Sequence, residues 1–228
     1  MEKKDTFMGI LMNRLGRCLF ATFGLLIFAV GSYFQIQANY GMSPWSSLNL
    51  GLSLNFPITY GTASILVSAI IIMVDILMHE PIGLGTILNA IVIGVGSDIC
   101  IAIGFVPVQT ELIGQTAVLL IGISITAVGQ FLYMSAGLSC GPRDSLLVGL
   151  GKRFPKVTIG TVNIVLLAVV FVGCLFLGSP VGLGTVISVF GTGMIMDIVF
   201  KILRFNPKAI VHEDLPGTLR ALAGAMKK

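Results

Sequence analysis

Four charged side chains in apolar surroundings are the residues of this sequence best suited to chemistry. Asp98 and Asp197 each lie inside a long apolar run, and Arg143 and Asp144 follow a Gly-Pro dipeptide. An ionised group inside a bilayer costs several kcal/mol unless it is paired, hydrated or neutralised, so such residues are functional candidates by default. The carboxylates can accept a proton or a cation, and Arg143 can serve as a countercharge.

The composition makes these charges exceptional. The chain has 228 residues, is 55% hydrophobic and 11% charged, and has a mean hydropathy of +0.99, whereas an average soluble domain is about 25% charged. Apolar runs near the ~20 residues that cross a bilayer occupy residues 16–38, 60–78, 84–104, 112–134, 159–177 and 183–203. The sequence therefore predicts an all-α integral membrane protein with six transmembrane helices. The first run has the length of a retained span rather than of a cleaved signal.

Several classes of chemistry have no support in the sequence. The four cysteines lack the paired spacing of a disulfide or zinc framework, and the two histidines share no ligand-spaced cluster. The glycines precede no phosphate-binding lysine, and no set of acid, base, nucleophile and cofactor converges. We expect no metal, no cofactor, no nucleic-acid partner and no enzymatic activity.

The chain contains an internal duplication. Pro44 aligns with Pro142 at an offset of 98, and Pro81 aligns with Pro180 at an offset of 99. Matched Gly, Thr and Asp residues accompany these prolines, and such matches are more specific than matched leucines. We therefore divide the chain into an N-terminus (1–14), a first membrane repeat (15–108), a second membrane repeat (109–204) and a C-terminal tail (205–228), which is a candidate for a short amphipathic helix or for a disordered tail.

An odd number of spans in each repeat predicts that the second copy crosses the membrane in the opposite sense. Basic residues concentrate in cytoplasmic loops. Here they cluster at the N-terminus, in residues 143–156 and in the tail, while residues 39–58 have none. This pattern predicts an inverted pair of repeats in the plasma membrane, with both termini cytoplasmic. Only the turn at His79 and Glu80 lacks its expected positive charge.

The duplication also gives the aspartates two interpretations. An ion pair between Arg143 and Asp197 is geometrically plausible, because both are expected toward the cytoplasm. The first repeat has Trp45 and Ser46 at the positions of the Arg-Asp pair. Asp98 thus lacks an equivalent arginine, and we expect it to meet a helix terminus or water. In the alternative interpretation, both aspartates only cap or lock helices. A further carboxylate, Asp75, is expected to be solvated near the end of its span.

Each repeat contains the same helix breakers, in "PIGLGT" and "PVGLGT". Proline and glycine interrupt a helix and permit sharp turns, and threonine can cap the helix that follows. The motif fits either a tight hairpin between two spans or a broken helix that faces a polar cavity. The breaker residues are Pro81, Gly83 and Gly85, and Pro180, Gly182 and Gly184.

A second repeated feature follows the first span of each half. Pro44 and Pro142 suit the first turn of a helix, and about ten apolar positions follow, which is too short to span. The segment is either an interfacial helix or a re-entrant half-helix whose N-terminus points into the protein centre. Binding candidates near these segments and in the facing spans are Ser43, Trp45, Ser46, Ser145, Asn89 and Gln130. The alternatives are a membrane-interface anchor for Trp45 and silent interhelical hydrogen bonds for the amides.

The duplicated Pro-Trp and "GPRD" loops, followed by "PIGLGT" and "PVGLGT", resemble those of the YczE-like bacterial integral membrane proteins, which are often grouped with YitT-type membrane proteins. The resemblance covers roughly residues 15–204. The first repeat departs from the family form "GPWD", since Ser43 and Ser46 stand where glycine and aspartate are expected. The resemblance implies a bacterial plasma membrane and little chemistry.

These patterns favour a small secondary transporter or permease for an unknown solute or ion, with its site where the repeats meet. Two other functions fit the same sequence: a scaffold or regulatory protein that does not transport, and a passive channel. The expected partners are the lipid bilayer, the solute, and either a second copy of the chain or another membrane protein.

Overall fold

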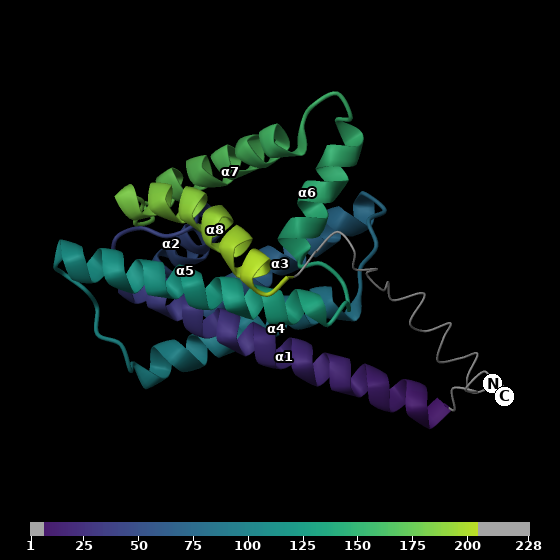
Figure 1. Ribbon diagram of the computed structural model, residues 1–228. Helices are drawn as coiled ribbons and strands as arrows, with labels where there is room; N and C mark the ends of the chain where they lie inside the picture. The colour runs from purple at the N-terminus through teal and green to yellow at the C-terminus, as the bar shows by residue number, and fades with distance from the viewer. Residues whose placement is uncertain (1–6, 205–228) are drawn as a thin grey trace.

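The structure is a computed structural model that describes residues 7–204, with side chains described from residue 15 onward. The predicted N-terminal segment is therefore described only in part, and the predicted tail lies outside the described residues. Within this part of the chain the fold is entirely helical (Figure 1). The helices are α1 (Phe7–Gln37), α2 (Pro44–Asn55), α3 (Tyr60–Leu77), α4 (Leu84–Ile103), α5 (Leu112–Ser135), α6 (Pro142–Arg153), α7 (Ile159–Phe176) and α8 (Leu183–Ile202).

Six of these helices are long and apolar enough to cross a bilayer, which confirms the predicted class and number of spans. They are α1, α3, α4, α5, α7 and α8. Large apolar residues such as Ile113 and Phe176 are more than 80% exposed. Exposure of this kind fits contact with lipid rather than with water. The two remaining helices, α2 and α6, have only 12 residues each.

The order of helix lengths recurs along the chain. Helices of 12, 18 and 20 residues follow α1, and helices of the same three lengths follow α5. The caps recur as well: the Thr59 hydroxyl accepts from the Thr62 amide at the start of α3, and Thr158 accepts from the Thr161 amide at the start of α7. An N-cap threonine satisfies a helix amide that would otherwise lack a partner.

The helices pack as two groups. The long-helix group consists of α1, α4, α5 and α8, in which α1 packs on α5 and α4, and α5 packs on α8. The short-helix group consists of α2, α3, α6 and α7, in which α2 and α6 each contact both α3 and α7. The groups meet mainly where α3 packs along α4.

The centre of the long-helix group is a close antiparallel crossing of α1 and α5. A Cβ added to Gly24 would lie 3.0 Å from the Gly129 carbonyl oxygen, and one added to Gly31 would lie 2.7 Å from the Gly122 carbonyl oxygen. Small residues let helix backbones approach closely in membranes. The duplication matches Gly24 with Gly122 and Gly31 with Gly129, so each glycine meets the counterpart of the other glycine in its own helix.

The repeated breaker motifs form hairpins between spans, at residues 78–83 and 177–182. The amide of Gly83 donates to the Thr86 hydroxyl, and the amide of Gly182 donates to the Thr185 hydroxyl. Each threonine turn also docks on the loop that precedes the short helix of the other half. Thr86 donates to the Cys140 carbonyl at 2.8 Å, and the Gly184 amide donates to the Tyr40 carbonyl at 2.9 Å.

Candidate functional site

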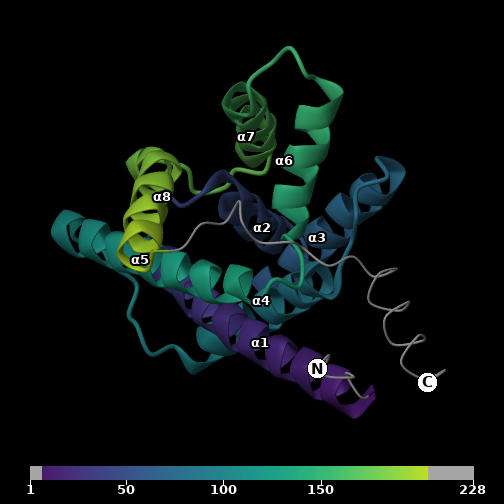
Figure 2. The ribbon, with the colours of Figure 1, turned by 45° about the vertical axis from the view of Figure 1, so that its right-hand side comes forward.

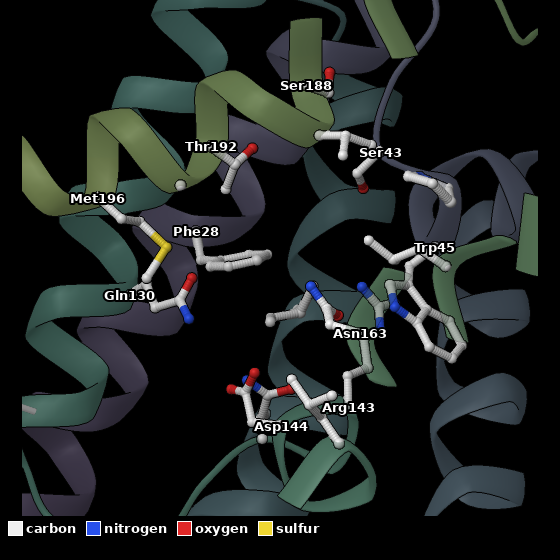
Figure 3. Close-up of a pocket in the computed structure, with 18 of the residues that line it drawn as sticks. Phe28, Ser43, Trp45, Gln130, Arg143, Asp144, Asn163, Ser188, Thr192 and Met196 are labelled. Atoms are coloured by element: carbon white, nitrogen blue, oxygen red, sulfur yellow. The ribbon is translucent and has the colours of Figure 1, made fainter. Parts of the chain in front are cut away.

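A cavity of about 370 Å³ lies between the long-helix group and the short-helix group, and all eight helices contribute to its wall (Figure 3). Its wall contains six of the sequence-predicted candidates: Ser43, Trp45, Asn89, Gln130, Arg143 and Asp144. The first turns of α2 and α6 both reach it, because Pro44, Trp45 and Arg143 line the same space. The structure thus brings the two short helices to one site.

Arg143 and Asp144 are the charged residues of the cavity. The Arg143 guanidinium lies 5.3 Å from the centre of the Trp45 ring, an arrangement that fits a cation–π contact. Figure 3 shows that Asp144 points away from this pair. Asp144 lies deep in the fold, yet its side chain stays accessible because it faces the cavity.

Burial shifts the pKa values of these two side chains in opposite directions. Loss of bulk water raises the pKa of Asp144 and lowers the pKa of Arg143, and each charge partly offsets the shift of the other. No hydrogen bond or ion pair joins either side chain to another described residue. The cavity therefore holds two opposite charges whose hydrogen-bonding capacity is free for a ligand.

Neutral polar side chains extend the same surface. Asn89 of α4 packs against Gly141, immediately before α6, and Gln130 of α5 lies on the other side of the cavity. Asn163 of α7 and Ser188 of α8 also line it, and the Ser188 hydroxyl is fully buried without a hydrogen-bond partner. These last two residues were not among the predicted site residues. Their only signal in the sequence is polarity within an apolar run.

Trp45 is partly buried, lines the cavity and contacts Arg143. Its roles as a binding residue and as an anchor at the membrane interface both stay predictions. Ser46 and Ser145 lie outside the cavity wall: Ser46 accepts a hydrogen bond from the Ser43 hydroxyl at 3.0 Å, and Ser145 is buried in α6.

Asp98 lies where α4 contacts the first turn of α3, and it does not line the cavity. Its carboxylate accepts hydrogen bonds from the Gly61 amide at 2.7 Å and from the Thr59 hydroxyl at 2.5 Å. The residue thus meets the N-terminus of α3, as the missing arginine predicts, and a carboxylate is favoured there by the helix dipole. We call the contact of Asp98 with Thr59 and Gly61 the α3–α4 clasp.

Asp197 has no such contact. It is exposed on α8, and neither Arg143 nor any other described residue pairs with it. The expected ion pair between Arg143 and Asp197 is therefore wrong, because the guanidinium turns toward Trp45 instead. Neither Asp98 nor Asp197 lines the cavity.

The missing clasp coincides with a separation of α7 from α8. These helices are joined by the turn at 177–182 and diverge from it (Figures 1 and 2), and they make at most a marginal contact. In the α3–α4 pair, a Cβ on Gly94 would lie 2.8 Å from the Gly61 carbonyl oxygen. A Cβ added to the matching Gly160 or Gly193 would have no neighbouring atom within 4 Å, and Gly193 lines the cavity.

Lys152 and Asp75 are charged residues that lie outside the cavity wall. Lys152, at the end of α6, forms an ion pair with Glu80 at 2.6 Å, which brings the expected positive charge to the turn at His79. Asp75 is fully buried, and neither of its carboxyl oxygens has a hydrogen-bond partner. The expectation that Asp75 is solvated is wrong, because α3 is covered on this face by the short helices.

Residues 15–201 match a protein family described as "Family of unknown function (DUF6198)". The chain belongs to this family. The DUF6198 match contains every helix that lines the cavity. The match also confirms the family resemblance that the paired loops indicated.

Individual relatives support the same assignment. An uncharacterised protein of Haemophilus influenzae is 34% identical over 188 residues, 81% of this chain and 84% of the relative. The uncharacterised membrane protein YczE of Bacillus subtilis is 30% identical over 175 residues, 76% of this chain and 80% of the relative. The uncharacterised protein YyaS of B. subtilis is 29% identical over 192 residues, 79% of this chain and 90% of the relative. No solved structure gives a significant match.

Proposed function

We propose that this protein is a secondary transporter for a small solute in a bacterial plasma membrane, built from two inverted repeats with both termini in the cytoplasm. The solute binds in the cavity between the long-helix group and the short-helix group. Movement of one group relative to the other exposes the cavity to each side in turn. Inverted repeats supply the two related conformations that alternating access needs.

Two observations support the inversion. The equivalent helices α1 and α5 cross antiparallel through matched glycines. The ion pair of Lys152 with Glu80 joins the basic end of α6 to the turn between α3 and α4, which supports a topology with both on one side of the membrane. The charge distribution favours the cytoplasm as that side.

The observation that carries the proposal is the different state of the two helix pairs. The α3–α4 pair is in close contact and the α7–α8 pair is separated, and we infer that the first closes the outward side of the cavity while the second leaves the cytoplasmic side open. Exchange of these two states between the repeats gives an outward-open conformation without a change of fold. The loops before α2 and α6, which pass between the groups, are the hinges.

In this account α2 and α6 are re-entrant half-helices. Their first turns line the cavity, and their last turns contact the turns of the opposite half: Asn55 donates to the Leu177 carbonyl, and Lys152 binds Glu80. Irregular backbone at membrane depth is tolerated where it is buried in protein or lines a polar cavity. The loops before Pro44 and Pro142 meet this requirement, because they dock on the threonine turns.

Reconstitution into proteoliposomes tests the proposal. Vesicles with the full-length protein are screened for saturable uptake of labelled ions, sugars, organic acids and amino acids. We expect at least one solute to be taken up and to exchange with its unlabelled form, and uptake to be lost in Arg143→Gln. The matched control is Ser46→Ala, which lies outside the cavity. Flux that does not saturate indicates a channel, and equal flux in empty vesicles contradicts transport.

A further inference from the structure

We propose that the cavity binds a small zwitterion, with its carboxylate at Arg143, its ammonium group at Asp144 and its apolar body between the cavity walls. This inference deepens the proposed function by naming the substrate class, but it requires only binding. It therefore has a test that does not depend on transport.

The Arg143 guanidinium is placed to receive a carboxylate. Its Cζ atom lies over the Trp45 ring, 5.3 Å from the ring centre, and none of its N–H donors is used by another described residue. The planar fork of arginine matches the two oxygens of a carboxylate, and stacking on an aromatic ring leaves the edge of that fork free. Tryptophan also holds the side chain in position before a ligand arrives.

Asp144 is placed to receive a cationic group. It stands in the first turn of α6, where the helix dipole favours its ionised form. The Asp144 carboxylate caps no amide of α6 and faces the cavity instead. Helix capping therefore does not explain its orientation. Asn89 and Gln130 also line the cavity, and their amide oxygens can accept hydrogen bonds from the remaining N–H donors of an ammonium group.

The pair of charges sets the net charge of the ligand. A ligand with one charge would neutralise either Arg143 or Asp144 and would leave the other facing the ligand without an opposite charge, which costs binding free energy. A ligand with both charges satisfies both residues. The first repeat carries Trp45 and Ser46 at the matching positions, so the cavity contains one such pair and one binding position.

The remaining walls fit a compact apolar body. Phe28, Leu166, Leu167 and Met196 line the cavity between the polar groups. A volume of about 370 Å³ is at the small end of the ~300–1,000 Å³ range of ligand pockets. The unpartnered Ser188 hydroxyl on the α8 wall offers one more hydrogen bond to a ligand or to a water molecule that accompanies it.

Equilibrium binding to the full-length protein in detergent tests this inference. The probes are L-alanine, L-leucine and L-phenylalanine, whose apolar bodies increase in size, each compared with its desamino acid and its decarboxylated amine. For leucine these analogues are 4-methylpentanoate and 3-methylbutylamine. Affinity is measured by calorimetry and by the shift of the thermal unfolding midpoint.

We expect at least one zwitterion to bind and both of its analogues to bind about tenfold or more weakly, the loss that removal of one charged hydrogen bond produces. In Arg143→Gln the zwitterion and its amine should bind equally, and in Asp144→Asn the zwitterion and its acid should bind equally. If either residue had a purely structural role, its substitution would weaken the binding of all three probes equally. Ser46→Ala is the matched control and should retain the wild-type order.

Other outcomes overturn the inference. An acid or an amine that binds the wild type as tightly as its zwitterion shows a site for a single charge. Failure of all three zwitterions, in a protein that transports another solute in vesicles, overturns the substrate class and leaves the transporter intact. Zwitterion binding without vesicle flux has the opposite meaning: it upholds the substrate class and contradicts transport.

Discussion

The α3–α4 pair and the α7–α8 pair have matching sequences and different structures. Both pairs carry a threonine cap, a glycine near the start of the first helix, and a glycine and an aspartate in the second helix. In the α3–α4 pair these residues form the clasp at Asp98 and a close glycine contact. In the α7–α8 pair the two glycines face open space and Asp197 is exposed.

This difference teaches that the closed contact is a matter of conformation rather than of composition. The α7–α8 pair has what it needs to close: Asp197 can accept from the Thr158 hydroxyl and the Gly160 amide as Asp98 accepts from Thr59 and Gly61. Asp197 has no contact in the described conformation, but closure of α7 on α8 would give it the contacts that Asp98 has. Substitution of one glycine or aspartate of a matched pair can therefore be compared with substitution of its counterpart.

The largest effect is expected at Gly160. A valine here has open space in the described conformation, so the unfolding free energy should change by less than about 0.5 kcal/mol. It would block closure of α7 on α8, so uptake in proteoliposomes should fall by about 100-fold, equivalent to a barrier or population change of roughly 2.7 kcal/mol. Loss of folding in this variant, or undiminished uptake, would count against the comparison.

The counterpart is Gly61→Val. Its side chain would collide with the Gly94 carbonyl and the Asp98 carboxyl, so the thermal unfolding midpoint itself should drop. The two glycine variants thus separate a defect of folding from a defect of conformational exchange. Circular dichroism melts in detergent measure the first, and vesicle uptake measures the second.

A smaller effect is expected from the aspartates. Asp98→Ala removes two hydrogen bonds at a helix N-terminus and should cost about 1–3 kcal/mol of stability, whereas Asp197→Ala should cost little in the described conformation. Both should slow transport, because each clasp closes one side. If chemical denaturation shows the same loss for both variants, the aspartates have equal contacts and the two pairs do not differ.

The smallest effect is expected within the short-helix group. Lys152→Ala removes an ion pair whose lysine is 61% exposed, and such pairs contribute about 0–1 kcal/mol. The contact is within one moving group, so transport should change less than twofold by the same uptake assay. A large loss would mean that α6 moves relative to the turn at Glu80.

Much of the fold followed from local sequence rules. The apolar runs were long enough to identify six spans, and Pro44 and Pro142 marked the starts of two short helices because proline is favoured in a first turn. The glycine-rich breakers fitted a hairpin, which the structure contains. Each of these features depends on residues close together in the chain.

The site was less predictable, because it depends on which helices face each other. Arg143 was expected to meet Asp197, but rotation of its side chain toward Trp45 is set by packing of α2 near α6, far apart in sequence. Asp75 seemed close to solvent by its position in the span, and only the short helices that cover α3 bury it. Asn163 and Ser188 joined the cavity through the arrangement of α7 and α8, which periodicity does not reveal.

Alternating access requires that the α3–α4 pair opens when the α7–α8 pair closes. In a variant without the four native cysteines, spin labels at the exposed positions Pro57 and Ile103 report on α3 and α4, and labels at Lys156 and Ile202 report on α7 and α8. Pulsed electron paramagnetic resonance in lipid should give a short and a long distance for each pair, and a condition that shortens the α7–α8 distance should lengthen the α3–α4 distance. A single unchanged distance in each pair, with and without transported solute, would contradict alternating access.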